Sequence, residues 1–351
     1  MGNKVTIQDI ADELGLSRNT VSKALNNAQG LASDTRERII RKAIELGYKQ
    51  FAYTQAILSA QLGGQVNAFP GDSLSGGEIA LFSTGFLNGS HFASLMLDWF
   101  QNAITKLGLT LSIHRITEDH LTERKPPETF RRDRTTAIIC FEMFDQSYDE
   151  ALCQLGIPIL FVDGPARIGG KSLPADQLYM DNRTGITQLV NDMLAAGKTR
   201  IGFIGNHRHC QSFYERYAAF RFAMLIAGVP VDERVCIEEN KRVEIAPRLE
   251  KLDSLPDLFI CANDFVALDT LQALRHLGYD VPRDVWLAGF DDSTESRSCM
   301  PRLTTVHIHT QIMAFSAVQL LRTRLGEPSL DYRQVYTETD LIYRESTPLS
   351  S

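Results

Sequence analysis

Residues 6–26 read TIQDIADELGLSRNTVSKALN, and this stretch decides the fold of the amino-terminal segment. Asp9 follows Thr6 by three residues, a capping-box spacing that predicts a helix starting after Thr6. Apolar residues at positions 7, 10, 11 and 14 have helical spacing, and Gly15 stands where helices often end in a left-handed residue. Ser17 then suits the N-cap of a second helix. The stretch therefore predicts two short helices joined by a tight turn.

A third helix is expected from Ser33 to about Leu46, with apolar residues at positions 39, 40, 43 and 44 facing the first two. In the second helix, Val21, Ala24 and Leu25 face this small core. The polar side chains left on its outer face are Arg18, Asn19, Ser22, Lys23 and Asn26. Three short helices around one shared core predict a helix-turn-helix domain.

The outer face of the second helix is suited to reading DNA. A recognition helix contacts base edges with its amino-terminal residues, where this helix carries Arg18 and Asn19. Arg can donate two hydrogen bonds to guanine, and Asn pairs in the same way with adenine. We expect Lys23 to join this readout, and further DNA contacts from Thr6, Ser17, Thr20, Ser22 and Asn26. The alternative is an ordinary helical cap with a solvated polar face.

Composition limits the possible classes of protein. The 351 residues predict two or three domains, and 44% apolar with 23% charged residues fits neither a disordered nor a membrane protein. The net charge is −7, yet residues 1–50 contain eight Lys and Arg against six Asp and Glu, so phosphate contacts are expected only there. Six widely spaced cysteines without a C-x-x-C pair predict reduced thiols. With no secretory signal pattern at the start, we expect a cytoplasmic protein.

The first 48 residues resemble the DNA-binding headpiece of the LacI/GalR family of bacterial transcription regulators. The shared frame is an Ile-Ala pair, a Gly-x-Ser turn, Thr-Val-Ser and Leu-Asn, continued by SDTRERIIRKAIELGY at 33–48. Family members most often carry Arg where this chain has Lys23. Together with the body motifs below, the resemblance spans residues 5–345 and implies a ligand-responsive regulator similar to the lac repressor.

The segment after Tyr48 departs from the family pattern, which usually continues with Pro-Asn-Ala-x-Ala-Arg-x-Leu as a hinge helix. This chain reads KQFAYTQAILSAQLGGQ at 49–65, with Gln55 in place of the Arg and Ile57 in place of the Leu. By the resemblance, Ile57 is the apolar wedge that enters the minor groove, and Ile suits such a wedge. Residues 62–78 are rich in Gly and polar residues and predict a linker. We therefore divide the chain into a headpiece (1–50), a hinge helix and linker (51–77) and a body (78–351).

The body alternates short apolar runs with helical stretches, which predicts an α/β fold with parallel sheets covered on both faces. The runs are 78–83, 110–115, 136–142, 158–164, 200–206, 257–264 and 284–292. By the resemblance, the body forms two doubly wound parallel-sheet subdomains, similar to periplasmic sugar-binding proteins, with a ligand between them. Because ligands bind at the carboxyl ends of parallel strands, we expect the polar residues that end these runs to converge on one cleft. They are Asp163, Asn263 with Asp264, and Asp291 with Asp292.

The resemblance also implies which residues hold the effector. The elements that match the family are LYMDNRTGITQLV (178–190), SFYERYAAF (212–220), CANDFVAL (261–268), LAGFDDS (287–293) and PRLTTV (301–306). By position, Asp163, Arg216, Asn263 and Asp291 lie where the lac-repressor branch contacts a sugar, and Phe92 matches a family aromatic. Carboxylates accept from neighbouring hydroxyls while Arg and Asn donate, so the set suits a sugar. The alternative for each acid is a helix N-cap. The aromatics left open between sugar stacking and core packing are Phe82, Phe141 and Phe290.

Catalytic motifs give only weak signals. The segment GPARIGGKS (164–172) resembles a phosphate-binding loop, but its glycine spacing is one residue too long. Two His-x-His pairs, 207/209 and 307/309, lack a third ligand at useful spacing. We therefore expect no cofactor, no metal and no catalysis. The alternative hypothesis of an enzyme, a nucleotide-using kinase or hydrolase, would require turnover of a phosphorylated substrate.

Taken together, the residues and the resemblance imply a homodimeric transcription regulator, with repression as the expected outcome. We expect it to bind a palindromic operator and to respond to a small effector, a mono- or oligosaccharide, without a membrane partner. The chain ends in YRESTPLSS without heptads, so we expect a dimer and not a coiled-coil tetramer. The rival hypothesis is a cytoplasmic solute-binding module without specific DNA binding.

Overall fold

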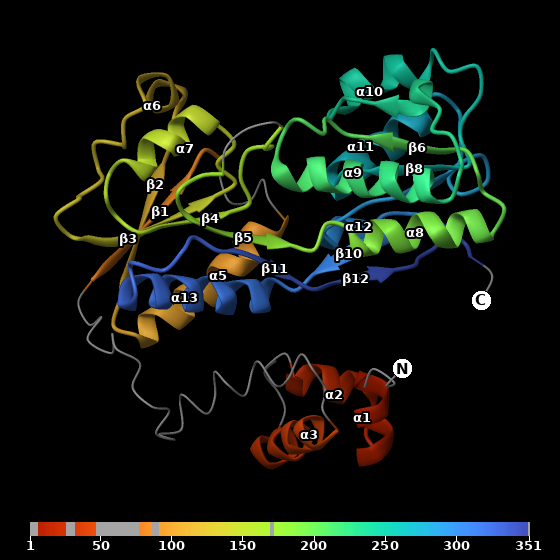
Figure 1. Ribbon diagram of the computed structural model, residues 1–351. Helices are drawn as coiled ribbons and strands as arrows, with labels where there is room; N and C mark the ends of the chain where they lie inside the picture. Colours follow the sequence, from red (N-terminus) through yellow and green to blue (C-terminus); the bar gives the residue numbers. More distant parts are fainter. Residues whose placement is uncertain (1–5, 26–31, 47–76, 86–90, 169–171, 350–351) are drawn as a thin grey trace. The chain divides into compact units, whose positions relative to one another are not determined.

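The computed structural model describes residues 6–25, 32–46, 77–85, 91–168 and 172–349 (Figure 1). The chain divides into two compact units, residues 1–70 and 71–351, and each is described by itself. Asn26 and most of the predicted hinge, including Ile57, lie outside the described residues, as does the side chain of Phe92. The predicted domain boundaries therefore stay predictions.

In the first unit, the described residues 6–25 and 32–46 form three helices, α1 (Ile7–Leu14), α2 (Arg18–Leu25) and α3 (Ser33–Glu45). A capping box of Thr6 and Asp9 opens α1, and Gly15 closes it with a φ of 63°. The Oγ of Ser17 accepts a hydrogen bond from the backbone N–H of Thr20 at 3.0 Å and caps α2. The small core consists of Ile10, Ala11, Val21, Ala24, Ile39 and Ala43. The predicted helices and their inner faces are confirmed for these residues.

The second unit contains two parallel sheets, which form two subdomains (Figure 1). The first sheet has the strand order β11-β5-β4-β3-β1-β2, and all its neighbours pair in parallel. Its strands are β1 (Glu78–Ser83), β2 (Thr110–Arg115), β3 (Thr135–Phe141), β4 (Ile159–Val162), β5 (Asp176–Met180) and β11 (Gln334–Thr337). The second sheet, β7-β6-β8-β9, is also parallel. Its strands are β6 (Ile201–Ile204), β7 (Cys236–Ile237), β8 (Leu258–Cys261) and β9 (Trp286–Ala288).

Helices cover both sheets. In the first subdomain α13 packs against α5 and the strands β4, β5 and β11, while in the second α10 packs on α11 and α8 packs on α9. The helices of the first subdomain are α5 (His91–Lys106), α6 (Glu118–Glu123), α7 (Gln146–Cys153) and α13 (Thr310–Gly326). Those of the second are α8 (Thr184–Ala195), α9 (Gln211–Ile226), the short 3-10 helix η2 (Glu233–Val235), α10 (Arg242–Leu249), α11 (Asp264–His276) and α12 (Thr294–Ser298).

The chain passes between the two subdomains three times. The first passage follows β5, and the second runs from β10 (Thr305–Ile308) into α13. The third leads from β11 in the first sheet to β12 (Thr339–Ile342), which pairs antiparallel with β10. Each subdomain is therefore built from separate parts of the sequence, and three neighbouring segments connect them (Figure 1).

The predicted α/β class and all seven predicted strand runs are confirmed, within a few residues at their ends. Five strands were not predicted, namely β5, β7, β10, β11 and β12. Four of them, β5, β10, β11 and β12, mix polar and apolar residues, and β7 has only two residues. Such segments carry little periodic signal, because their pairing depends on distant parts of the chain.

Candidate DNA-binding surface and effector site

The outer face of α2 presents the predicted base-reading side chains to solvent. Arg18, Asn19 and Lys23 are exposed, whereas Val21 and Ala24 of the same helix are buried in the small core. Because the inner face of α2 packs against the small core, the backbone of the helix is fixed and its long donor side chains project from the surface. This arrangement fits insertion of the amino-terminal end of α2 into a major groove.

Several hydroxyls that were predicted to contact DNA already take part in capping. The Oγ1 of Thr6 donates to Asp9 at 2.8 Å, and these capping bonds lower the pKa of Asp9. The hydroxyls of Ser17 and Thr20 bond to each other at 2.8 Å. In this conformation, therefore, Thr6 has no hydroxyl proton to offer a phosphate. Ser22 is half-buried on the same helix.

In the body, three of the four implied effector residues lie together. A terminal nitrogen of Arg216 lies 3.8 Å from Oδ1 of Asp291, and their side chains are 3% and 8% exposed. Asp163, from the other subdomain, is 3% exposed, and the charge of Arg216 acts on it. Because Asp163 follows β4 while Arg216 and Asp291 belong to the second subdomain, the group spans both halves of the body. We call Asp163, Arg216, Asp291 and the neighbouring Glu142 the strand-end cluster.

Arg216 is the cation at the centre of the cluster. Its Nε donates to Oδ1 of Asn182 at 2.9 Å, and a terminal nitrogen donates to the carbonyl of Ala262 at 2.7 Å. Its guanidinium lies 3.5 Å from the centroid of the Phe290 ring. Burial lowers the pKa of Arg216, although the charges of Asp291 and other acids oppose this shift.

Burial has the opposite effect on the acids. It raises the pKa of Asp163 against the N–H of Gly164 and the charge of Arg216, which stabilise the carboxylate. It also raises the pKa of Asp291 well above its ordinary value, again against Arg216. The cluster therefore holds desolvated groups that gain from any partner that hydrogen-bonds to them.

The backbone at the strand ends is unusual. Glu142 after β3, Asp163 after β4 and Asp291 after β9 have φ angles of 51°, 56° and 116°. Few residues other than glycine adopt positive φ, and such strain is often found where side chains must be aimed at a ligand. Three acids with this backbone at the same edge of the parallel sheets make this edge the candidate binding site.

Glu142 was not among the predicted site residues. Its backbone N–H donates to the carbonyl of Val162 at 3.0 Å, which sets it beside the end of β4, and its charge raises the pKa of Asp291. The signal was present in the sequence, since Glu142 is the polar residue that ends the apolar run 136–142.

A second group of contacts joins the two subdomains next to the cluster. Gln211, at the start of α9, donates its backbone N–H to the carbonyl of Gly164 at 2.8 Å, and its side-chain oxygen accepts from the backbone N–H of Arg167 at 3.0 Å. The carboxylate of Glu215 accepts hydrogen bonds from the side chains of Asn182, Gln211 and Tyr336. These residues carried no sequence signal of their own, because their role depends on how the subdomains meet.

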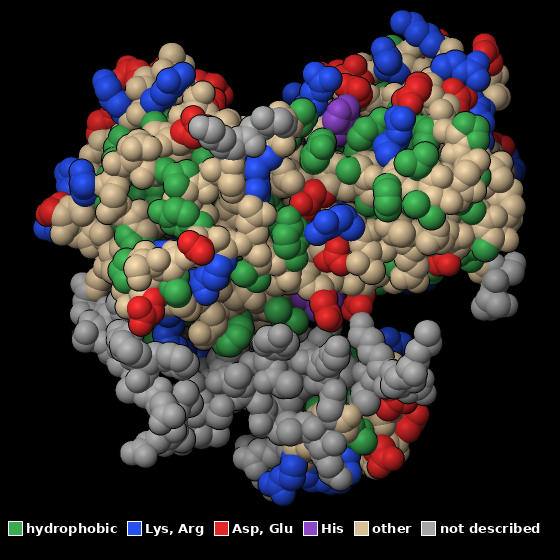
Figure 2. Space-filling view, in the orientation of Figure 1, with side chains coloured by type: hydrophobic (Ala, Val, Ile, Leu, Met, Phe, Trp, Pro, Cys, Tyr) green, Lys and Arg blue, Asp and Glu red, His purple; other side chains and the backbone are tan. Residues whose placement is uncertain are grey.

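A basic hollow lies at the other end of the second sheet. Lys and Arg side chains gather around α10 (Figure 2). The hollow is lined by Arg200, Arg234, Arg248, Lys251, Leu252, Asp253 and Ser254. Arg200 directly precedes β6, so the hollow faces the amino ends of the strands, away from the strand-end cluster. Asp232 accepts hydrogen bonds from both Arg200 and Arg234, so part of the positive charge of the hollow is already balanced.

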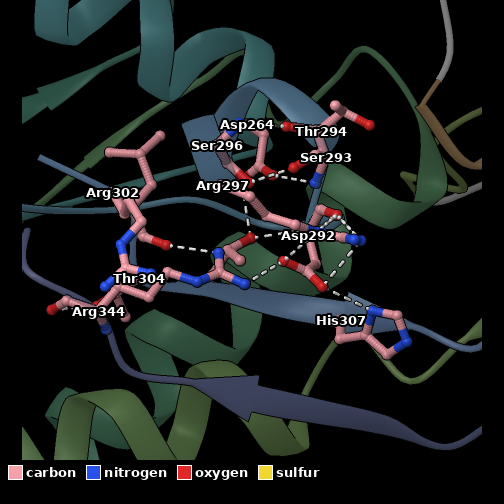
Figure 3. Close-up of polar contacts among 12 residues, drawn as sticks. Asp264, Asp292, Ser293, Thr294, Ser296, Arg297, Arg302, Thr304, His307 and Arg344 are labelled. Carbon is pink, nitrogen blue, oxygen red and sulfur yellow. Dashed lines mark hydrogen bonds and ion pairs between the residues drawn. The ribbon is translucent and has the colours of Figure 1, made fainter. Parts of the chain in front are cut away.

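Two of the acids that were expected in the cleft turn away from it. Figure 3 shows Asp292 at the centre of contacts from His307, Arg297 and Arg344. Asp264 accepts from the backbone N–H of Ser293 at 2.8 Å and from the Thr305 hydroxyl at 2.7 Å. The expectation that both would converge on the cleft is wrong. Asp264 ties the start of α11 to the loop after β9 and to β10, and Asp292 ties that loop to β10 and to the segment after β12.

Asn263 caps a helix and was expected to contact the effector. Its side-chain oxygen accepts from the backbone N–H of Val266 at 3.0 Å and caps α11. It stays next to the cluster through Ala262, whose carbonyl binds Arg216.

The structure also shows where the aromatic residues and the His-x-His pairs lie. Three of the aromatics are fully buried in the core, namely Phe82, Phe141 and Phe290. His307 bonds to Asp292 and His309 to Asp340, at 2.9 and 3.0 Å. Within the described part of the chain, His, Cys, Asp and Glu form no group that could hold a metal. None of its described helices has the length and apolar character needed to cross a bilayer.

Comparisons with known proteins agree with both units. The model of the lacI family of bacterial regulatory proteins matches residues 6–50, and that of the periplasmic binding protein-like domain matches residues 190–347. The chain is 25% identical to the HTH-type transcriptional regulator CelR of Thermobifida fusca, over 97% of this chain and 98% of that protein. It is 23% identical to the HTH-type transcriptional repressor PurR of Vibrio parahaemolyticus, with the same coverage.

Solved structures share the fold. A complex of the transcriptional regulator CelR with cellobiose matches with a TM-score of 0.67 and 22% identity, over 98% of this chain and all of that chain. The lac repressor dimer bound to operator and the anti-inducer ONPF matches with a TM-score of 0.66 and 18% identity, over 98% and 99% of the two chains.

A helix-turn-helix unit followed by a periplasmic-binding-protein-like body defines a DNA-binding regulator with a ligand-binding body. Residues 6–50 form a lacI-family DNA-binding domain, and the body is periplasmic-binding-protein-like. The chain is a transcription regulator that is similar along its length to HTH-type regulators.

Proposed function

We propose that this protein is a dimeric repressor whose operator affinity is set by a small sugar bound at the strand-end cluster. The observation that carries the proposal is the placement of Asp163 of one subdomain within reach of the charges of Arg216 and Asp291 of the other, at strand ends with strained backbone. Its site of action is the cytoplasm, where the operator DNA lies. No catalytic step is part of the proposal.

In this proposal α2 reads the operator. Arg18 and Asn19 contact base edges, Lys23 adds a third contact, and the helix N-termini contact phosphates. From the sequence alone, Asn26 and Ile57 are assigned to the same surface, with Ile57 as the wedge at the operator centre. Each good base contact contributes about 1–3 kcal/mol of discrimination against a wrong base.

An exposed apolar face on α9 supports the homodimer. Phe222, Leu225 and Ile226 follow the helical spacing of a single face and are 62%, 71% and 73% exposed. Apolar side chains are visible over α9 among the charged ones (Figure 2). Large apolar side chains that gather on one exposed face commonly mark a protein interface. Leu225→Asp should therefore yield monomers in analytical ultracentrifugation, whereas Val243→Asp, equally exposed on α10, should stay dimeric; dimers in both variants would contradict this interface.

The effector is proposed to be a sugar because the cluster supplies carboxylates as acceptors and an arginine as donor within one site. Phe92, Asn263 and the cluster residues are the proposed contacts. The solved relative that binds cellobiose, with the same fold, supports this class of ligand.

Effector binding acts on DNA affinity through the relative position of the subdomains. A ligand can shift this equilibrium only by its differential affinity for two conformations of the body. A ligand that bridges Asp163 with Arg216 or Asp291 favours one subdomain arrangement, and the change reaches the headpieces through the chain that leads into the first sheet.

Selection of duplexes from a random DNA pool by the full-length protein, at stated salt, tests the proposal. We expect an enriched palindrome of about 14–20 base pairs with half-sites one helical turn apart. No enrichment, with or without a panel of sugars, would contradict specific operator binding and favour the solute-binding alternative.

A further inference from the structure

The charges of the strand-end cluster limit which sugars fit. The cluster contains three carboxyl groups, those of Glu142, Asp163 and Asp291, and one cation, Arg216. Their mutual influence is direct, since the charges of Glu142, Asp163 and Arg216 all act on the carboxyl group of Asp291. Burial and the charges of the neighbouring acids raise the pKa of Asp291, so the cluster disfavours negative charge even on its own carboxyl groups.

The single cation is already engaged by the protein. Arg216 gives hydrogen bonds to Asn182 and Ala262 and lies 3.8 Å from Asp291, so much of its charge and donor capacity is in use. An incoming phosphate would have to compete with these partners. It would also bring a second negative charge next to buried acids whose pKa is already raised, and such a charge is unfavourable in the same desolvated site.

The guanidinium of Arg167, a half-buried residue on the loop after Asp163, also serves the protein. Arg167 donates from one terminal nitrogen to Gln177 at 2.6 Å and to the Tyr179 hydroxyl at 2.7 Å, and from the other to Ser172 at 3.4 Å. Exposed cations lie farther out, with Arg115 at the end of the edge strand β2 and Arg208 on the loop between β6 and α9. An anionic effector would therefore need a cation from outside the cluster, and Arg208 and Arg115 are exposed candidates at or after strand ends.

We propose that the effector is an uncharged polyhydroxyl compound and that Glu142, with Asp163 and Asp291, excludes phosphorylated and carboxylated sugars. Hydroxyl groups donate to carboxylates, so a neutral sugar satisfies the acids without adding charge. This inference rests on the proposed sugar-binding function and narrows it to one class of ligand.

The test compares neutral and phosphorylated sugars on the full-length protein by isothermal titration calorimetry. The probes are glucose and cellobiose with their 6-phosphates, followed by further neutral sugars and their phosphates in pairs. We expect a neutral sugar to bind at least about tenfold more tightly than its phosphate, because like charges repel in a desolvated site. Glu142→Gln should narrow this ratio, whereas Glu150→Gln, an exposed acid on α7, should leave it unchanged.

Each other outcome is decisive. A phosphorylated sugar that binds as well as its neutral counterpart would overturn the inference but leave sugar control intact, and loss of this binding in Arg208→Gln would identify the cation responsible. If no sugar of either kind binds, the sugar assignment of the proposed function fails. Titration with nucleoside monophosphates and dicarboxylates then tests the exclusion of anions by the cluster. Binding of such an anion that Arg216→Lys weakens would contradict this exclusion, and the absence of anion binding would uphold it.

Discussion

The outer face of α2 and the strand-end cluster use charge in opposite ways. On α2, Arg18 and Lys23 are exposed on a helix held by a core of six small and branched residues. In the cluster, Arg216 is 3% exposed and is surrounded by acids. An exposed cation costs the fold little and is available to a polyanion, whereas a buried one must be balanced within the protein. The first surface therefore suits DNA, and the second suits a small ligand that completes an existing polar network.

The same contrast separates acids that look alike in sequence. Asp163 and Asp291 take part in the cluster, while Asp264 and Asp292 hold loops together (Figure 3). Asp149 on α7 is a third kind, a buried acid whose two carboxyl oxygens have no hydrogen-bond partner among the described residues. Position after a strand or on a helix does not distinguish these roles, but their partners do.

The largest expected effect is on Asp264. Asp264→Ala leaves the buried Ser293 N–H and the Thr305 hydroxyl without their acceptor, and we expect the body to lose about 4 kcal/mol of stability. Urea unfolding monitored by circular dichroism measures this. The matched control is Asp253→Ala, whose carboxylate is 91% exposed and should matter little. Equal losses in the two variants would remove the distinction between loop-holding and surface acids.

The next effect is the pH dependence of stability that Asp149 causes. Burial raises its pKa from 3.8 to about 9, so the folded protein retains a proton that the unfolded chain releases. The contribution of this group to stability is thus full below pH 3.8 and is lost progressively as pH rises to about 9. Asp149→Asn should remove this slope and gain about 3 kcal/mol at pH 6.

Urea unfolding of wild type and Asp149→Asn between pH 5 and 8 checks this prediction, with Glu150→Gln on the same helix as the control. Parallel stability curves for wild type and Asp149→Asn would show that Asp149 finds a partner and is not a lone buried acid.

A smaller effect is expected at the DNA surface. Arg18→Ala should cost about 2 kcal/mol in operator binding and relax base preference at one position in each half-site. Arg36→Ala, on α3, is a control for a cation of the same unit outside α2. Repeating the duplex selection with both variants shows whether preference at a single position is lost. An unchanged consensus for Arg18→Ala would contradict its assigned role.

The sequence predicted the regular features and missed those that depend on assembly. The capping box, the glycine at the end of α1 and the apolar runs are local signals, so the headpiece helices and seven strands were predicted correctly. Asp163, Arg216 and Asp291 were named by their place in family motifs. The cap that Asn263 forms on α11 is local, and it is the alternative to the effector role. The contacts of Asp264 with Thr305 and of Gln211 with Arg167 join segments that lie far apart in sequence. No local pattern encodes such contacts.

The central claim is that the α2 surface reads DNA and the strand-end cluster reads the effector. The most direct test measures the Kd of a fluorescent operator by anisotropy, with and without the neutral sugar that binds, for wild type, Arg18→Ala and Asp291→Ala. We predict that Arg18→Ala raises the Kd while the sugar still changes it by the same factor, and that Asp291→Ala keeps the wild-type Kd but loses the sugar response. A retained response in Asp291→Ala at the same sugar concentration would contradict the account.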